Sequence, residues 1–287
     1  MTIGTKIKTL RTAKGMSQNE LADSIGVSRQ AITKWETDNG LPDIGNLKAI
    51  SKLFEIPINA IIMDDLNLYS STIQYDIDSD KDFDIESVPA NSIYMYGGNS
   101  EKIRIEMLSD TISTLDSDLK VSVEDRKHKM IIRMNRRNDL TESMCRSDLD
   151  IIIRLPRKYV AGIELRSDVN RLSLKGLDAE DIEFNGEAET ILLDDVHGQV
   201  EMDVRSDCRF GLMNLDGSLE INQIGKNSVV GVTDKLRFRA VNAGRKCELI
   251  IDDDMVIDEN SKDTIEINGM KNTLRIEVVE RDLSADQ

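Results

Sequence analysis

Residues Gln18–Glu36 read QNELADSIGVSRQAITKWE, and this stretch decides how the N-terminal part of the chain folds. Ser17 stands directly before it and Glu20 follows three residues later, the spacing of a capping box that begins a helix. Gly26 supplies the positive φ that a tight turn needs, and Ser28 is a second N-cap. The stretch therefore predicts a short helix, a sharp turn and a second short helix.

Helical patterns also lie on both sides of this stretch. Apolar residues at helical spacing, such as Ile7 and Leu10 before it and Leu47 and Ile50 after it, indicate amphipathic helices. We expect a five-helix bundle over residues 1–64, with helices at about 5–14, 18–24, 28–37, 44–54 and 58–63.

The pattern of apolar and polar residues changes after Asp64. Residues 65–74 are polar and aperiodic, as in a linker, and short runs that alternate apolar and polar residues follow over 75–287. Apolar positions recur there every nine or ten residues, at Leu172, Ile182, Ile191, Val200, Phe210, Leu219 and Val229. Such spacing favours a repeated β-strand unit, a β-solenoid, and a β-sandwich is the alternative. The chain is thus expected to be multidomain, α then all-β.

Spaced residues of the opening stretch carry a family resemblance. The stretch resembles the helix-turn-helix of the Cro and phage-repressor (XRE) family at Leu21, Ala22, Ile25, Gly26, Val27, Ile32 and Trp35, and flanking matches extend the resemblance over about residues 3–64. Ala22 must be small where two helices cross, and Val27 and Ile32 fill the space behind the second helix. The segment GLDAEDIEFNGEAETILLDDVHGQVEMDV resembles, in texture only, the adhesin-type β-solenoid repeat domains of bacteria.

The helix-turn-helix resemblance implies binding to double-stranded DNA. In such domains the second helix enters the major groove, which places Arg29, Gln30 and Lys34 at base edges, with Thr33 near them. Phosphate contacts are expected from Gln18, Ser28, Lys6 and Lys14. Arg11 and Glu36 match a structural pair between the first and third helices, Ala22 and Gly26 shape the turn, and Trp35 is expected to pack in the core.

Charge is distributed unevenly along the chain. Residues 1–65 hold eight basic and eight acidic residues, so the other 29 basic and 45 acidic residues carry the whole net charge of −16. Residues 1–40 hold six basic and four acidic residues. A slightly basic tip on an acidic body fits a protein that touches DNA with one end. The N-terminus has no apolar signal segment and no apolar run reaches 18 residues, so we expect a cytoplasmic protein without a membrane partner.

Other chemistry is sparsely represented. The three cysteines, Cys145, Cys208 and Cys247, lie far apart, which argues against a disulfide framework and a zinc knuckle. His128 and His197 lack nearby partners in the sequence, and the acidic runs at 194–195 and 252–254 lack calcium-loop spacing. We expect no enzyme, metal or cofactor. The basic run 125–137 remains open between a solvated turn and a contact with DNA or a second subunit.

Two function hypotheses follow. The first is a sequence-specific transcription regulator whose β region dimerises the chain or senses a protein or small-molecule effector. The second is a β-solenoid interaction scaffold whose helix-turn-helix serves autoregulation or DNA tethering. The sequence leaves open the operator, the signal, and repression against activation.

Overall fold

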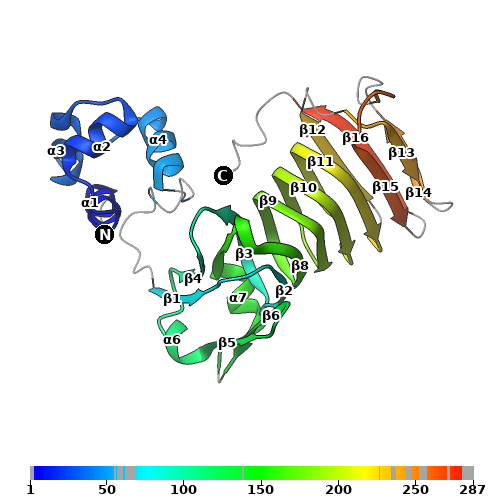
Figure 1. The fold of residues 1–287 in the computed structure, drawn as a ribbon, viewed down its shortest axis with the longest axis horizontal. Coiled ribbons are helices and arrows are strands. Elements are labelled where there is room, and N and C mark those ends of the chain that lie inside the picture. The colour runs from blue at the N-terminus through cyan, green and yellow to red at the C-terminus, as the bar shows by residue number, and fades with distance from the viewer. Residues whose placement is uncertain are drawn as a thin grey trace. The chain divides into compact units, whose positions relative to one another are not determined.

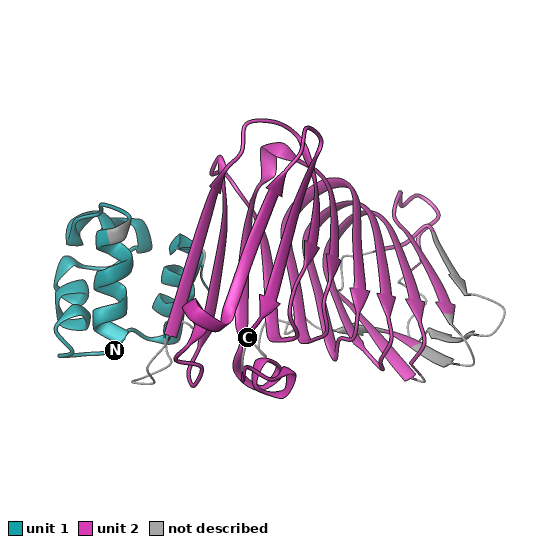
Figure 2. Cartoon of the chain, turned by 90° about the horizontal axis from the view of Figure 1, so that it is seen from below, with its two compact units in different colours: residues 1–68, 284–287 teal, residues 69–283 magenta. Residues whose placement is uncertain are grey.

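The computed structural model describes residues 3–54, 56, 61, 69–137, 139–225, 227–233, 237–243, 247–251, 257–269 and 272–279. The chain divides into two compact units, residues 1–68 with 284–287, and residues 69–283 (Figure 2). The first is helical and the second is rich in strands.

Four labelled helices form the first unit: α1 (Ile3–Ala13), α2 (Gln18–Ile25), α3 (Arg29–Glu36) and α4 (Ile44–Phe54) (Figure 1). Their ends follow local signals, because Ser17 and Ser28 cap α2 and α3, and Gly15 has a φ of 71° after α1. The fifth helix, expected at 58–63, falls on residues that lie outside the described part except for Ile61, which is helical and fully buried.

The buried core of the helical unit is mainly aliphatic and includes Trp35. Ile7, Leu21, Ile32 and Ile50 are each 0% exposed, and Trp35 closes the cluster at 6%. The four aliphatic residues come one from each helix, so the burial of their side chains holds α1 to α4 together.

The second unit contains β1 (Tyr69–Asp76), β2 (Lys81–Glu86), β3 (Ala90–Gly98), β4 (Lys102–Ser109), α6 (Leu115–Asp118), β5 (Leu119–Asp125), β6 (Lys129–Arg136), α7 (Glu142–Asp148), β7 (Asp150–Pro156), η1 (Arg157–Tyr159), β8 (Val160–Arg166), β9 (Val169–Gly186), β10 (Thr190–Val204), β11 (Arg209–Gln223), β12 (Asn227–Thr233), β13 (Ala240–Ala243), β14 (Cys247–Ile251), β15 (Thr264–Gly269) and β16 (Asn272–Val279). Strands β1, β4 and β7 pair antiparallel, as do β5 and β6, whereas β9 to β12 pair parallel. The described region is a mixed sheet that does not close on itself.

The long strands β9, β10 and β11 lie side by side in register (Figure 1). Leu172 pairs with Ile191 and Ile191 with Phe210, while Ile182 pairs with Val200 and Val200 with Leu219. The expected interval of nine or ten residues is therefore half of the true one. Alternate members of the series belong to two separate ladders, and the chain returns to each ladder after 18 or 19 residues.

The structure differs from two sequence-based predictions by a few residues. The residue opposite Phe210 in β12 is Val230, which is 0% exposed, while the expected Val229 pairs with Arg209 and is half-buried. Strand β1 begins at Tyr69, inside the stretch 65–74 that we expected to be a linker. It pairs with β4 along its full length, so backbone hydrogen bonds order a sequence whose side-chain pattern is weak.

Glycines mark a bend of the parallel strands. Gly198 and Gly217 are register partners with φ values of 127° and 145°. A Cβ atom on Gly217 would overlap the carbonyl oxygen of Gly198, and one on Gly198 would overlap the carbonyl oxygen of Ala179. Only glycine allows the neighbouring backbones to approach this closely in that conformation.

Candidate nucleic-acid interface

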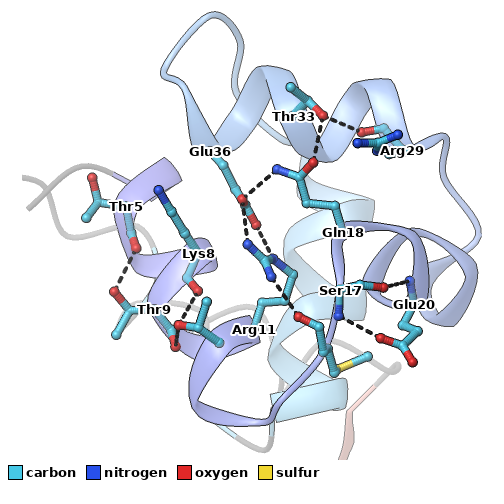
Figure 3. A network of polar contacts seen from close by, with 12 residues as sticks. Thr5, Lys8, Thr9, Arg11, Ser17, Gln18, Glu20, Arg29, Thr33 and Glu36 are labelled. Carbon is cyan, nitrogen blue, oxygen red and sulfur yellow. Dashed lines mark hydrogen bonds and ion pairs between the residues drawn. The ribbon is translucent and has the colours of Figure 1, made fainter.

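The turn between α2 and α3 has the geometry that its residues predict. Ser17 accepts a hydrogen bond from the amide of Glu20, whose carboxylate accepts one from the amide of Ser17 at 2.6 Å (Figure 3). Gly26 adopts the left-handed conformation at φ 72°, and its amide donates to the carbonyl of Ala22. Ser28 then caps α3 by accepting from the amide of Ala31. These contacts fix where α3 begins relative to α2.

The outward face of α3 carries Arg29, Gln30, Thr33 and Lys34, which are all exposed. Ile32 and Trp35 lie on the buried face of the same helix. Among the described residues, no hydrogen bond or ion pair occupies the side-chain nitrogens of Arg29, Gln30 or Lys34, so their donors are available to a ligand. Guanidinium and amide groups on one helix face match the donor and acceptor pattern of guanine and adenine in the major groove.

A buried ion pair connects α1 to α3. Arg11 Nε lies 2.5 Å from Glu36 Oε1 and a terminal guanidinium nitrogen lies 3.0 Å from Oε2, with side chains 11% and 2% exposed (Figure 3). Arg11 also donates to the carbonyl of Met16 at 2.6 Å. Burial would raise the pKa of Glu36, but hydrogen bonds from Arg11 and Gln18 outweigh burial and hold it below the usual value. The pair thus fixes the orientation of α3 on α1.

Gln18 extends this network toward the outward face of α3. Its amide nitrogen donates to Glu36 Oε2 at 2.9 Å, and its Oε1 lies 3.1 Å from the hydroxyl of Thr33 (Figure 3). The side chain of Gln18 therefore braces α3, and Thr33 is held by the same contact and by the carbonyl of Arg29 at 3.1 Å. The first residue of α2 is placed beside the candidate base-reading face.

The residues expected to contact phosphate differ in their contacts and their exposure. Lys14 Nζ donates to the carbonyl of Leu53 at 2.6 Å and lies 5.5 Å from the centre of the Phe54 ring. It thus caps the C-terminal end of α4. Lys6 on α1 is half-buried, and the Ser28 hydroxyl is engaged in capping α3.

Two further residues of the unit escaped the sequence reasoning. A Cβ on Gly4 of α1 would overlap the carbonyl oxygen of Trp35, so this glycine permits close packing of α1 on the end of α3. Asp43 accepts from the amide of Asn46 at 2.8 Å and caps α4. The aspartate three residues before Asn46 was a readable cap signal, whereas the Gly4 contact is visible only in three dimensions.

The basic run 125–137 lies in the second unit and is largely neutralised. Its cations pair with neighbouring carboxylates: Arg126 with Glu124, Lys129 with Asp84, Arg133 with Glu86, and Arg136 with Glu142. Most of its charge is thus already balanced by carboxylates of the same unit, which disfavours the DNA contact.

The other candidate groups form no cluster of three or more potential metal ligands within the described residues. His197 lies 3.2 Å from Asp195 and 3.5 Å from Asp216, in a surface row of ion pairs, while His128 lies in the exposed turn between β5 and β6. Cys145 and Cys208 are buried free thiols, and burial raises the pKa of both. The side chain of Cys247 and the run 252–254 lie outside the described part. No helix in the described ranges is long and apolar enough to cross a membrane.

Comparison with known proteins places the first unit. The helix-turn-helix family model matches residues 7–61, so the N-terminal unit contains a helix-turn-helix domain of the XRE type. The HTH-type transcriptional activator BcrR of Enterococcus faecalis is 42% identical over 62 residues, which are 22% of this chain and 30% of that protein. The SPbeta prophage-derived regulator YonR of Bacillus subtilis is 32% identical over 75 residues, 26% of this chain and 64% of that protein. The chain thus matches less than two thirds of either relative.

Solved structures resemble the remainder of the chain. A candidate cell adhesion protein from Clostridium sporogenes aligns with 74% of this chain and 100% of its own, at 11% identity and a TM-score of 0.36. A candidate adhesin from Parabacteroides distasonis aligns with 74% of this chain and 98% of its own, at 12% identity and a TM-score of 0.31.

Proposed function

We propose that the protein is a cytoplasmic, sequence-specific transcription regulator that binds double-stranded DNA through α3. Arg29 and Gln30 read base edges, Lys34 and Thr33 flank them, and Gln18 braces α3. The single observation that supports this most is the outward face of α3. The exposed side-chain nitrogens of Arg29, Gln30 and Lys34 are free of partners in the described chain, while Ile32 and Trp35 anchor the opposite face. The XRE-type domain and the two regulator relatives support the same function.

Phosphate contacts are part of the proposal, with Gln18, Ser28, Lys6 and Lys14 as the candidate residues. Lys14 Nζ also donates to the carbonyl of Leu53 at the end of α4, so a phosphate contact from Lys14 would compete with that bond. With residues 1–65 neutral overall, one unit gains little from counterion release, and a second DNA-binding unit on an adjacent half-site raises the effective concentration. We therefore include homodimerisation in the proposal.

The second unit is proposed to be a β-solenoid that dimerises the chain or senses an effector. The parallel register that repeats every 18 or 19 residues supports the solenoid form. Its acidic surplus repels DNA, so DNA would engage the helical units alone. This arrangement lowers non-specific affinity more than operator affinity.

The test compares binding of the full-length chain to its own promoter fragment and to random DNA of equal length. We expect wild-type protein to prefer the promoter, and Arg29→Ala to reduce that preference about 5- to 150-fold, the equivalent of one base contact. Lys48→Ala on the exposed part of α4 is the matched control and should leave the preference unchanged. Equal loss on both DNAs for Arg29→Ala would show a phosphate contact instead of base reading, and absence of any promoter preference would refute the proposed function.

A further inference from the structure

Strand β5 is an open edge of the sheet. It pairs antiparallel with β6, its only strand partner in the described chain (Figure 1). The amide of Arg126 donates to Lys129 and the amide of Arg137 donates to Asp118, which fixes the phase of the ladder. The even-numbered residues of β5 therefore direct their backbone groups to β6. Of the odd-numbered residues, Val121, Val123 and Asp125 direct theirs away from it, whereas the amide of Leu119 already donates to the carbonyl of Leu115 in α6.

The burial of the β5 side chains follows the same even and odd alternation. Lys120, Ser122 and Glu124 are exposed, whereas Leu119 is buried and Val121 is half-buried against the core. Unpaired backbone groups on a strand of seven residues offer a template for another strand. The charges on its exposed face determine which strand fits.

We propose that a second copy of this chain pairs its own β5 with this edge, antiparallel, about a two-fold axis at Ser122. The outward backbone groups of Val121 then bond those of Val123 in the other copy. At the ends of the ladder the carbonyl of Leu119 accepts from the amide of Asp125, while the amide of Leu119 keeps its bond to Leu115. Lys120 stands directly opposite Glu124 of the other copy, twice per dimer, in non-hydrogen-bonded pairs where side chains approach most closely. The interface is isologous, so one surface serves both subunits.

The charge pattern selects this register over its neighbours. The outward backbone groups belong to odd-numbered residues, so any alternative register must again place odd-numbered residues of one copy opposite odd-numbered residues of the other. The nearest alternatives move the two-fold axis by one residue. A two-fold axis at Val121 would oppose Asp118 to Glu124, and one at Val123 would oppose Lys120 to Arg126. Both neighbours place like charges together, which destabilises a strand pair. Only the axis at Ser122 opposes unlike charges among these three.

The neighbouring contacts are compatible with the pairing. Glu124 already accepts from Arg126 at 2.9 Å, but its carboxylate is 58% exposed and has acceptor capacity for a second donor. The other strands that end the described sheet, β1, β13 and β14, carry at most one charged residue each. None of them offers a complementary pair of charges to a copy of itself.

This inference deepens the dimerisation part of the proposed function and rests on it. The experiment measures the dimer dissociation constant of the full chain by sedimentation and light scattering. We expect Lys120→Glu and Glu124→Lys each to weaken the dimer about tenfold or more, because each replaces two attractive pairs by repulsive ones. The double variant should return to within about threefold of wild type, since it restores opposite charges.

A backbone variant tests the strand pairing separately. Val121→Pro removes an amide that points away from β6, so the β5–β6 ladder stays intact while the new ladder loses a donor. We expect dimerisation to be lost with the circular dichroism of the β region unchanged. Lys127→Glu in the adjacent exposed turn is the control and should leave the constant within about twofold, because no charge of the other copy lies opposite it.

The failures are distinguishable. A dimer that persists in Lys120→Glu and Val121→Pro would refute the β5 interface and leave the proposed DNA-binding function standing. A double charge variant as weak as the single ones would refute the Lys120–Glu124 register. A wild-type chain that is monomeric at micromolar concentration would overturn both the interface and dimerisation, whereas promoter preference is measured independently of either.

Discussion

Replacing Glu36 by glutamine isolates the charge that joins α1 to α3. Glu36→Gln keeps the shape of the side chain but leaves the Arg11 guanidinium, 11% exposed, without its carboxylate. Removing one member of a buried pair costs about 3–5 kcal/mol because the other charge stays desolvated. Arg11 retains its bond to the Met16 carbonyl, so we expect the low end, about 3 kcal/mol.

That loss is large relative to the stability of the unit. A unit of fewer than about 70 residues holds only about 3–5 kcal/mol in its core. With a urea slope of about 1 kcal/mol/M, the unfolding midpoint should fall by about 3 M, close to unfolding without denaturant. Replacing the pair by apolar residues, Arg11→Met with Glu36→Leu, should recover most of the loss because no charge is then buried alone.

The chain contains one tryptophan, and it reports on this unit. Trp35 lies in the helical core, so its fluorescence follows unfolding of the first unit in the full-length chain while circular dichroism follows the strands of the second. Glu20→Gln, which alters an exposed capping box, is the control and should shift the midpoint by about 1 M or less. A Glu36→Gln midpoint within about 0.5 M of wild type would refute the assignment of the pair as a structural link.

Three further outcomes are expected. Glu36 has a lowered pKa in the folded state, so its stabilisation is present above the unfolded pKa of about 4.3 and is lost as pH falls through the folded pKa; Glu36→Gln should flatten this acid limb of Trp35 fluorescence, and an unchanged limb would contradict it. Gly26→Ala should destabilise the first unit by about 1–2 kcal/mol through its positive φ alone, because nothing lies within 4 Å of an added Cβ; an unchanged urea midpoint would contradict this. Residues 1–66 alone should give helical circular dichroism, and a coil spectrum would place the unit boundary elsewhere.

The helical unit was readable because its signals are local. Ser17, Glu20, Gly26 and Ser28 act within a few residues of themselves, and the helix limits that they predict agree with α2 and α3 to within one residue. The role of Lys14 was not readable, because its partner Leu53 is 39 residues away and nothing in the pattern marks it. Whether Arg29 and Gln30 read bases stays a prediction.

The β region shows where a periodic pattern stops being informative. Alternation of apolar and polar residues indicates strands but carries no strand direction, so spacing alone fitted both a sandwich and stacked parallel strands. Likewise, the sequence does not show which of the two consecutive valines at 229 and 230 points into the core. In the structure Val230 pairs with Phe210. The antiparallel pairs before β9, which are β1 with β4, β4 with β7 and β5 with β6, show the same alternation of apolar and polar residues as the parallel strands after it.

The parallel register gives the β region a unit of length. Residues 190–208 form one complete turn of this arrangement. Thr190, the first residue of the turn, pairs with Arg171 of the preceding turn and with Arg209, the first residue of the following turn. Excising this turn would bring Leu172 opposite Phe210 with every inward and outward position preserved. Such a region can lengthen or shorten by whole turns through duplication or deletion within the gene, without redesign of its ends. Any other increment would put the aliphatic rows out of phase.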